Sequence, residues 1–216
     1  MSSEIAIEKL ATRPQWVNAA EGELVEQLRA GSQAAYVSLV NQFEHSIYNL
    51  MLRMLGDPHD AGDVTQEVFI KVFRGINGFN GDSNLRTWIY RIALREAANW
   101  RRWWVRRRYN RTVSLDLVDP EDGETRVYEN LLRDNSSSPA DQLLRGELEA
   151  RLQSALKSLP IKYRMAVVLR DVEDFSYEEI ATTLHISLGT VKSRILRGRE
   201  LLRDKLKTLF GKDDLS

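Results

Sequence analysis

The chain has 216 residues, of which 43% are hydrophobic and none is cysteine, and its formal net charge is zero. Without cysteine it has no disulfides and no thiolate metal sites, and no apolar run reaches the roughly 18 residues of a membrane-spanning helix. The first residues, MSSEIAIEKLATRPQW, lack the basic and apolar segments of a signal peptide. We therefore expect a protein of the reducing cytoplasm.

The neutral total hides a sorting of the charges into blocks. Arg91–Arg111 holds eight basic residues and one acidic residue, whereas Val113–Gln142 holds eight acidic and two basic residues. Lys192–Lys207 is basic again, with seven basic and two acidic residues. This pattern indicates two basic modules separated by an acidic tether.

The N-terminal part begins with weakly patterned sequence. Residues 1–22 show little periodicity, and we expect a loosely ordered leader there. A short helix is predicted over Glu23–Ala30, ending at Gly31. Ser32 is then the N-cap of a long helix, whose apolar residues keep helical spacing: Tyr36, Val40, Phe43, Ile47, Met51 and Met54.

Asp57 and Pro58 start the next helix, as its N-cap and first residue, and this helix runs over about His59–Gly75. One side is an apolar arc of Val64, Val68, Phe69, Val72 and Phe73. The opposite side has two interpretations, a solvated face or a face that binds a partner through fixed carboxylates and an exposed isoleucine. It consists of Asp63, Gln66, Glu67, Ile70 and Arg74.

A glycine-rich loop, Asn77–Asn84, precedes a helix rich in arginine and tryptophan over Arg86–Arg111. One helical face carries Leu85, Trp88, Ile89, Ile92, Trp100 and Trp103, and another carries Arg91, Arg95 and Arg102. Basic charge beside flat rings suits an unpaired nucleic-acid strand, because guanidiniums follow phosphates and rings stack on bases. On this stretch alone, a core helix with a solvated basic back is the favoured interpretation, and the rest of the chain has to decide.

Val113–Ser137 is acidic and aperiodic, which predicts a flexible linker of roughly 25 residues that reaches about 80 Å when fully extended. Ser138 is the expected N-cap of a new helix with Pro139 at its first position. Pro160 ends this helix, and another follows over about Lys162–Val172. The apolar stripe of the first helix is Leu144, Leu148, Leu152, Ala155, Leu156 and Leu159.

Ser176–Arg203 has the pattern of a helix-turn-helix. Ser176 and Glu179 form a capping box, His185 and Ile186 make a short turn, and Ser187 caps the second helix. The inner face of that helix is Leu188, Val191, Ile195 and Leu202. Its outer side can enter the major groove, where basic side chains reach guanine and Leu196 meets a thymine methyl. The candidate DNA contacts are Thr190, Lys192, Ser193, Arg194, Leu196, Arg197 and Arg199. An ordinary αα-hairpin with a basic back is the alternative.

These elements predict an all-α protein of two helical bundles joined by a flexible acidic linker, the C-terminal bundle being a helix-turn-helix domain. The expected units are a leader over 1–22, a first domain over 23–112, the linker over 113–137 and a second domain over 138–212. His59-Asp60 is similar to the dipeptide of metal phosphohydrolases, but the other ligands of such a site are missing. We expect no metal, no cofactor and no catalytic residue.

Three stretches, DAGDVTQEVFIKVFRGINGF, GDSNLRTWIYRIALREAANWRR and the helix-turn-helix, resemble the sigma-E-like members of the extracytoplasmic-function (ECF) group of bacterial RNA polymerase sigma factors. The resemblance covers about residues 23–208. It implies that Asp63, Gln66, Glu67, Ile70 and Arg74 bind core polymerase, at the clamp helices of its largest subunit, with the flap as a further contact. The loop residues Asn80, Gly81, Asp82 and Ser83 then capture a flipped base, and Trp88, Arg91, Arg95, Asn99 and Arg102 read and open the −10 element.

By the same resemblance, the helix-turn-helix reads the −35 element as duplex, the −10 element is bound single-stranded, and the linker runs toward the active-site cleft of the polymerase. An anti-sigma factor is an implied partner, and a small-molecule substrate is not. The chain has Arg95 where the family often has asparagine and Asn80 where arginine is frequent, so no promoter sequence is carried over. The competing interpretation is a stand-alone activator with a response-regulator-like output domain, which needs an α/β receiver upstream.

Overall fold

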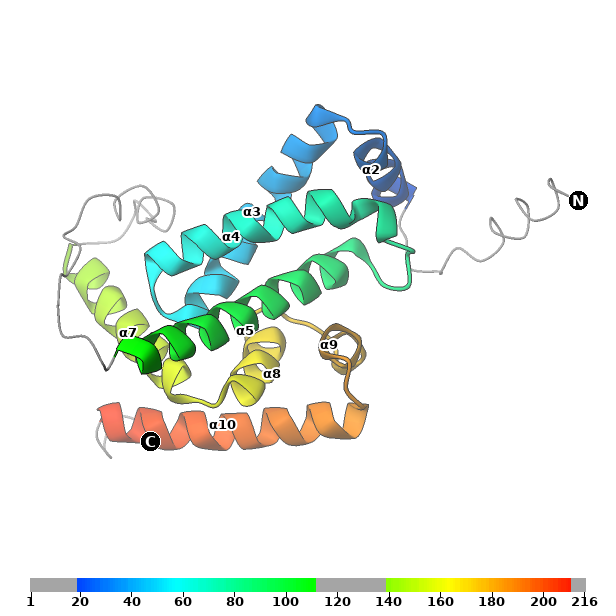
Figure 1. The fold of residues 1–216 in the computed structure, drawn as a ribbon. Coiled ribbons are helices and arrows are strands. Elements are labelled where there is room, and N and C mark those ends of the chain that lie inside the picture. Colours follow the sequence, from blue (N-terminus) through cyan, green and yellow to red (C-terminus); the bar gives the residue numbers. More distant parts are fainter. Residues whose placement is uncertain (1–18, 112–138, 211–216) are drawn as a thin grey trace, which may run out of the picture.

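The computed structural model describes residues 19–111 and 139–210, and the side chains of 19–103 and 146–208. These residues fold into helices and connecting loops, without a strand, so the part described offers no α/β receiver. Figure 1 shows α2 to α5 as an upper group, α8 to α10 as a lower group, and α7 at one side. The helices are α2 (Ala19–Arg29), α3 (Gln33–Leu55), α4 (Pro58–Gly75), α5 (Leu85–Arg111), α7 (Pro139–Ser158), α8 (Ile161–Asp171), α9 (Tyr177–Leu184) and α10 (Leu188–Phe210), with a 3-10 turn η1 (Ile76–Gly78).

Helix α2 starts inside the segment expected to be a leader, so that expectation is wrong for residues 19–22. The reason is a long-range contact. Glu21, in the first turn of α2, accepts a hydrogen bond from the backbone N–H of Leu85, while Val25 and Leu28 are buried in the core. Residues 1–18 lie outside the described part of the chain.

The predicted helix starts at α3 and α4 are confirmed. The Ser32 hydroxyl accepts from the Ala35 N–H at 3.3 Å, and the Asp57 carboxylate accepts from the Asp60 N–H at 3.0 Å. Such caps satisfy donors that the first turn leaves free and contribute about 1 kcal/mol each. Between the two helices Gly56 has φ of 76°, the left-handed geometry that ends α3.

The core of the N-terminal group follows the predicted helical stripes. Ile47 and Met51 of the predicted α3 stripe are fully buried, and so is Leu39, which the prediction missed. Helix α3 packs on α4, and burial of each such side chain contributes about 1.5–3 kcal/mol. Phe73 is an exception, because half of its surface is exposed. Its ring packs edge-on against Tyr36 at 5.1 Å, so Phe73 is wrongly predicted as core.

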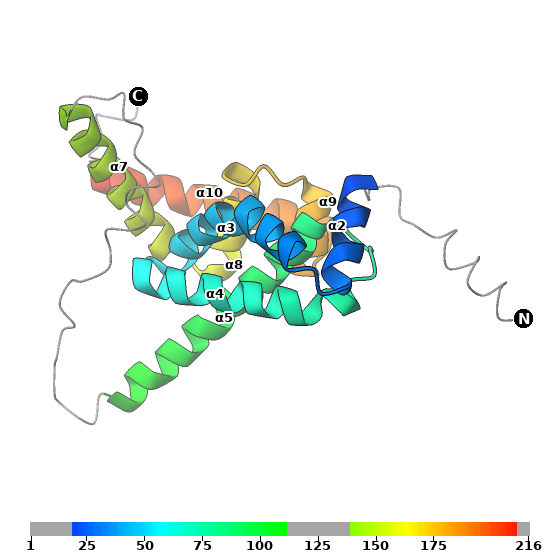
Figure 2. The same cartoon turned by 90° about the horizontal axis from the view of Figure 1, so that it is seen from above.

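The stripe predicted for α7 is only partly buried. Ala155, Leu156 and Leu159 are in the core, but Leu148 and Leu152 are 44% and 37% exposed. Figure 2 shows why, since the N-terminal half of α7 projects away from the other helices. The side chain of Leu144 lies outside the described set. The prediction therefore holds for the last two turns and is wrong for Leu148 and Leu152.

Helices α8 and α10 approach each other unusually closely at Gly198. A Cβ atom at this position would lie 2.5 Å from Cγ2 of Val167 and 3.3 Å from the carbonyl oxygen of Tyr163, so a larger residue requires the helices to separate. Val191 and Ile195 are buried as predicted, whereas Leu188 is 42% exposed. The prediction of Leu188 as an inner residue is therefore wrong. Leu188 is the first residue of α10, and the buried face of this helix begins at Val191.

The two helical groups are in contact with each other. Helix α3 packs against α7 and α8, and α5 packs against α9, as both views indicate (Figures 1 and 2). One continuous set of buried residues runs through both groups. The sequence predicted two bundles, and the structure adds that they are docked. The predicted linker, 113–137, lies outside the described residues.

Candidate nucleic-acid and polymerase interface

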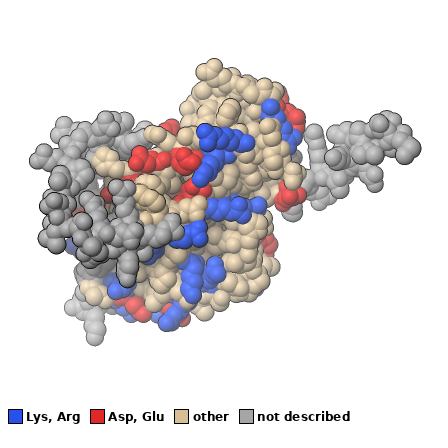
Figure 3. Space-filling model, in the orientation of Figure 1, with Lys and Arg blue, Asp and Glu red and all other residues tan. Residues whose placement is uncertain are grey.

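The residues predicted for partner binding on α4 share one exposed face. Asp63, Gln66, Glu67, Ile70 and Arg74 are all exposed, Ile70 by 40%. Figure 3 shows acidic side chains gathered over α4, with basic side chains beside them over α4 and α5. The helix therefore presents carboxylates and one apolar side chain to solvent, which fits a partner with basic and apolar groups.

One carboxylate of this face has a partner that the sequence did not reveal. Lys71 lies 3.4 Å from Glu67 and 2.5 Å from Glu96 of α5. The hydrogen bond to Glu96 is the main reason why the pKa of Lys71 is raised. Lys71 thus ties α4 to α5 and partly balances the charge of Glu67.

The predicted capture loop leads directly into α5. Asn84 caps the helix, because its Oδ1 accepts from the Thr87 N–H at 2.7 Å. Within the loop Asn80 and Asp82 are exposed, while Gly81, at φ of 75°, and Ser83 are buried. Of the four predicted loop residues, only Asn80 and Asp82 present side chains to solvent, where a ligand could contact them.

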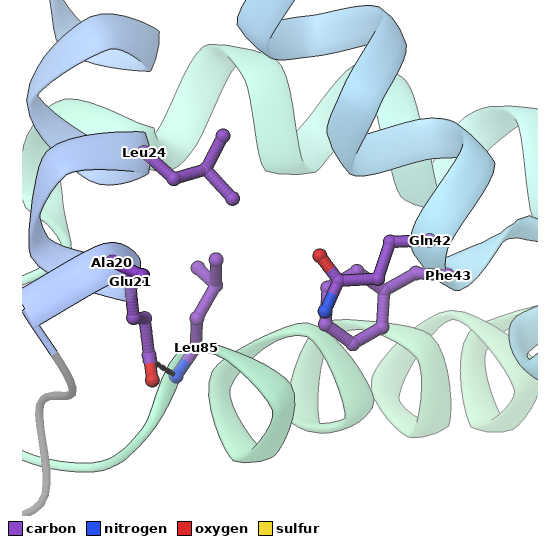
Figure 4. Close-up of a pocket in the computed structure, with 6 residues that line it drawn as sticks. All are labelled: Ala20, Glu21, Leu24, Gln42, Phe43 and Leu85. Atoms are coloured by element: carbon purple, nitrogen blue, oxygen red, sulfur yellow. Dashed lines mark hydrogen bonds between the residues drawn. The ribbon is translucent and has the colours of Figure 1, made fainter.

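A cavity of about 230 Å³ lies behind this loop, between α2, α3 and the start of α5. Figure 4 shows Glu21, Gln42 and Phe43 around it, with the Glu21 carboxylate bonded to the Leu85 backbone N–H. An acceptor at this point satisfies a free donor of the first turn of α5 and favours the helix dipole. The Glu21 carboxylate therefore already has a structural role, which is to position α5.

Helix α5 divides into a packed edge and an open edge. Trp88 is half-buried, and its ring centroid lies 5.4 Å from that of Phe79. A side chain at Gly75 would place its Cβ 3.4 Å from the Trp88 ring, so the indole packs closely on this glycine. Arg91 is also half-buried, and burial, followed by repulsion from Arg95, lowers its pKa. Arg95, Asn99 and Arg102 are exposed. The side chains of 104–108, the densest part of the arginine and tryptophan run, lie outside the described set.

The helix-turn-helix has the predicted geometry. The Ser176–Glu179 capping box is present with both of its hydrogen bonds. His185 adopts φ of 52°, the left-handed conformation that histidine tolerates better than most residues. The Ser187 hydroxyl accepts from the Thr190 N–H at 3.3 Å and so caps α10.

The outer face of α10 is available to a ligand. Lys192, Ser193 and Arg197 are exposed, Leu196 is 64% exposed, and Thr190 and Arg194 are half-buried. The exposed Leu196 adds one apolar group to this basic face, and a thymine methyl is a suitable contact for it.

Two arginines of α10 are engaged in ion pairs within the protein. Arg197 lies 2.9 Å from Glu200, one turn along the helix. Arg199 forms two hydrogen bonds with Asp171 at the end of α8, and this interaction raises the pKa of Arg199. Sequence reasoning treated both as free cations, and missed Asp171 because it lies 28 residues away.

No cluster of three potential metal ligands occurs among the residues that the structure describes. In the same residues, none of the helices combines the length and hydropathy of a membrane span. His59 and Asp60 lie in the first turn of α4, where the Asp57 cap sits. Burial is the main cause of a raised pKa at Asp60.

Comparison with known proteins adds family evidence to this geometry. A family model of sigma-70 region 2 matches residues 39–110, and one of sigma-70 region 4 matches residues 149–202. The chain is 39% identical over 188 residues to the RNA polymerase sigma-H factor of Pseudomonas aeruginosa, covering 87% of this chain and 94% of that protein. It is 37% identical over 187 residues to the ECF RNA polymerase sigma-E factor of Escherichia coli K12, with 87% and 94% covered.

Two solved structures show the same fold. The sigma factor RpoE in complex with the anti-sigma factor NepR, from Bartonella quintana, matches with a TM-score of 0.59 at 21% identity, over 80% of this chain and 96% of that one. CnrH, in complex with the cytosolic domain of CnrY, matches with a TM-score of 0.60 at 23% identity, over 88% and 98%. Together with the relatives above 30% identity, the two helical groups identify the chain as a member of the ECF RNA polymerase sigma factors, which act in promoter-specific initiation of transcription.

Proposed function

We propose that this protein is a dissociable initiation factor in which each of the two domains has a separate role. The first domain, 23–112, binds core RNA polymerase and opens the −10 element, and the second, 138–212, reads the −35 element as duplex. The protein is a binding factor rather than an enzyme, and the polymerase performs the chemistry. It acts in the cytoplasm, where the polymerase is found.

The observation that carries the −35 assignment is the outer face of α10. Ser187 and the left-handed His185 fix the angle between α9 and α10, and the exposed residues lie near the N-terminal end of α10, the part of a recognition helix that contacts base edges. Arg197 and Lys192 suit guanine, and Leu196 suits a thymine methyl.

The −10 assignment rests on the open edge of α5 and on its loop. Arg95, Asn99 and Arg102 form a polar strip along α5, and the exposed loop residues Asn80 and Asp82 precede this helix. Such exposed polar groups suit phosphates and unstacked bases. The Trp88 ring packs against Phe79 and is half-buried. Separated strands can therefore contact only its exposed edge, unless the packing around the ring changes.

The polymerase assignment rests on the exposed face of α4. Asp63 and Glu67 present carboxylates on either side of Gln66, and Ile70 adds an apolar group one turn on. A basic, partly apolar helical pair, such as the clamp helices of the largest subunit, is complementary to it. The flap is the proposed second contact.

An anti-sigma factor is a further proposed partner. The two solved relatives of similar fold were determined in complexes, one with the anti-sigma factor NepR and one with the cytosolic domain of CnrY. The exposed leucines of α7, Leu148 and Leu152, are apolar surface of the kind that a protein partner covers.

The proposal is tested by separating the two roles in one set of variants. Glu67→Lys should weaken binding to core polymerase at least tenfold, since it puts a cation in a face built for basic partners. Glu44→Lys, on an exposed position of α3, is the matched control. Both variants should keep the affinity of the parent for duplex DNA selected from a randomised pool.

Arg197→Ala should have the opposite profile. We expect a loss of about 1–3 kcal/mol at one or two base pairs of the selected duplex, with core binding intact. Fluorescence anisotropy on a series of duplexes with single base-pair substitutions measures this loss of binding free energy. Equal loss on every duplex would mean that Arg197 contacts only phosphate, and unchanged core binding by Glu67→Lys would remove the polymerase role of α4.

A further inference from the structure

One residue of α5, Glu96, has no place in the DNA contacts proposed for this helix. It is the only acidic residue between Leu85 and Arg111, a segment rich in arginine. A carboxylate on a DNA-facing helix repels phosphates and lowers the affinity for DNA, unless its charge is balanced within the protein. The presence of Glu96 in this helix therefore calls for a reason.

Lys71 of α4 balances the charge of Glu96. The Nζ of Lys71 lies 2.5 Å from Oε2 of Glu96, and this hydrogen bond is the main cause of the raised pKa of Lys71, which keeps the ammonium protonated. Only 14% of the Glu96 side chain is exposed. Because α4 packs on α5, the carboxylate is held in one place between the two helices.

The second carboxylate oxygen of Glu96 is bonded to Asn99. The Nδ2 of Asn99 donates to Oε1 of Glu96 at 3.4 Å, and the Arg102 guanidinium donates to Oδ1 of Asn99. Glu96, Asn99 and Arg102 follow one another at intervals of three residues, so they lie along one side of α5. A line of hydrogen bonds thus runs from Lys71 to Arg102.

The two neighbours of Asn99 permit only one orientation of its amide. A carboxylate only accepts hydrogen bonds and a guanidinium only donates them, so the amide NH2 must face Glu96 and the amide oxygen must face Arg102. The reverse orientation would place donor against donor and acceptor against acceptor. An exposed asparagine without such neighbours can adopt both orientations.

The orientation of this amide matters because Asn99 is exposed and is one of the residues proposed to read the −10 element. The amide keeps a second N–H and a second lone pair. These two groups can bond one base edge, as asparagine does with N6 and N7 of adenine. Exchange of the nitrogen and the oxygen would reverse donor and acceptor, and a different base edge would then fit.

We propose that Glu96 is a positioning residue for −10 recognition. It sets, through Asn99, the pattern of donor and acceptor that α5 presents to an unpaired base, and Lys71 holds Glu96 in place for this role. A side chain already held in its bound orientation also loses less conformational freedom on binding. The inference rests on the proposed function for the identity of the DNA contact.

Two simpler roles of Glu96 predict different behaviour. An ion pair that only stabilises the packing of α4 on α5 would change stability when it is removed, but not the preference for a base. A charge that only repels phosphates would change the affinity equally for all sequences and alter its dependence on salt. A positioning role changes the preference at one base position, and only while Asn99 is present.

Glu96→Gln separates these roles because it keeps the length of the side chain. Its one amide oxygen goes to Lys71, which only donates, so its NH2 group faces Asn99. Asn99 then meets donors on both sides and has no single favoured orientation. Glu44→Gln, at an exposed position of α3, is the control for the loss of one negative charge.

Nuclear magnetic resonance of the free, isotope-labelled protein tests the orientation of Asn99. The side-chain N–H signals of Asn99 are assigned by their loss in Asn99→Ala. They should shift in Glu96→Gln and keep their positions in Glu44→Gln. If Glu96→Gln leaves them unchanged, Glu96 does not hold Asn99 and the inference fails. That result leaves the proposed function intact, because neither polymerase nor DNA is present.

Promoter selection with the holoenzyme tests how Asn99 is used. Core polymerase with the full-length protein transcribes a library in which only the −10 region is random, and the enriched sequences are read. At one position, Glu96→Gln should lower the preference for the best base about fivefold or more, the discrimination of one good contact between a side chain and a base. In the Asn99→Ala background, the same substitution should change this preference by less than about twofold, since the two residues act as one unit.

An unchanged base preference in Glu96→Gln, or an equal change in the Asn99→Ala background, would overturn the inference while the sigma role stands. If circular dichroism shows that Glu96→Gln does not fold, Glu96→Asp replaces it. Its side chain is one methylene too short to reach both Lys71 and Asn99, so it must lower the same preference by a smaller amount. If the parent holoenzyme starts no RNA, the proposed function fails and the inference fails with it.

Discussion

Arg164 offers the sharpest test of how the two domains are held together. It is 2% exposed and donates hydrogen bonds to the carbonyl oxygens of Met54, Lys157 and Leu159. These three oxygens lie at the C-terminal ends of α3 and α7, where carbonyls lack helical partners and a cation is favoured. Burial lowers the pKa of Arg164 to about 10, so the side chain remains charged at neutral pH.

Arg164→Met keeps the length of the side chain and removes all of its donors. Three carbonyls, two of them in buried hydrogen bonds, then lose their partner, at about 1 kcal/mol each. Relief from burying the guanidinium offsets part of this loss, so we expect the free energy of unfolding to fall by about 2–4 kcal/mol. Arg203→Met, at an exposed position of α10, should change it by less than about 0.5 kcal/mol.

Urea denaturation followed by two probes makes the measurement specific. All five tryptophans, Trp16, Trp88, Trp100, Trp103 and Trp104, precede the linker, so fluorescence reports unfolding of the first domain, whereas circular dichroism reports all helices. Arg164 belongs to the second domain. With a slope of about 2 kcal/mol per molar urea, both midpoints should fall together by roughly 1–2 M.

Two results would refute this reasoning. A loss below about 0.5 kcal/mol would mean that the three carbonyls find other partners without strain. A shift seen by circular dichroism but not by tryptophan fluorescence would mean that the second domain unfolds alone, and that Arg164 does not couple it to α3.

Three further predictions concern single positions. Gly198→Ala places a methyl group 2.5 Å from a side-chain carbon of α8 and should lower stability by about 1–3 kcal/mol in thermal denaturation, while Gly146→Ala, with nothing within 4 Å, should leave it equal or slightly raised. Because burial and two arginines of α5 lower the pKa of His185, the folded protein favours the neutral ring. This contribution to stability is fully present above about pH 6.5 and is lost as pH falls below it, so the thermal midpoint should drop between pH 8 and 5.5 in the parent and drop less in His185→Asn. Asp57→Ala removes the cap of α4 and should lower stability by about 1 kcal/mol, and an unchanged midpoint would show that water replaces the cap.

Local features of the fold were predictable because their signals are local. The caps at Ser32, Asp57 and Ser176 depend on a residue and a backbone N–H two or three positions later, and all three are present. The exposed faces of α4 and α10 follow from helical period, and the turn at His185 follows from the break in that period before the Ser187 cap.

Side chains whose burial depends on how helices pack were predicted less well. Leu148 and Leu152 keep the same spacing as the buried Leu156, yet only the C-terminal part of α7 reaches the core. Phe73 lies at the end of the apolar arc of α4, where its ring packs against Tyr36 but half of its surface stays exposed. Periodicity gives the direction of a side chain and not the extent of the neighbouring helix.

The contact between domains left no signal in the sequence. Tyr90 and Glu173 are 83 residues apart, and no sequence pattern pairs them. The sorted charges suggested separate basic modules, whereas hydrogen bonds and a shared set of buried side chains dock the two groups. Long-range polar pairs of this kind emerge only from coordinates, because no spacing rule relates their partners.

The most direct test of the sigma role is run-off transcription with core RNA polymerase and a library of promoter sequences. Core polymerase with this protein should start RNA at defined positions, downstream of two short sequence elements that the enriched promoters share. The Glu67→Lys variant should abolish this RNA, and Arg197→Ala should change which −35 sequences are enriched. If core polymerase plus the protein starts no RNA and the two do not bind each other, the protein is not an initiation factor.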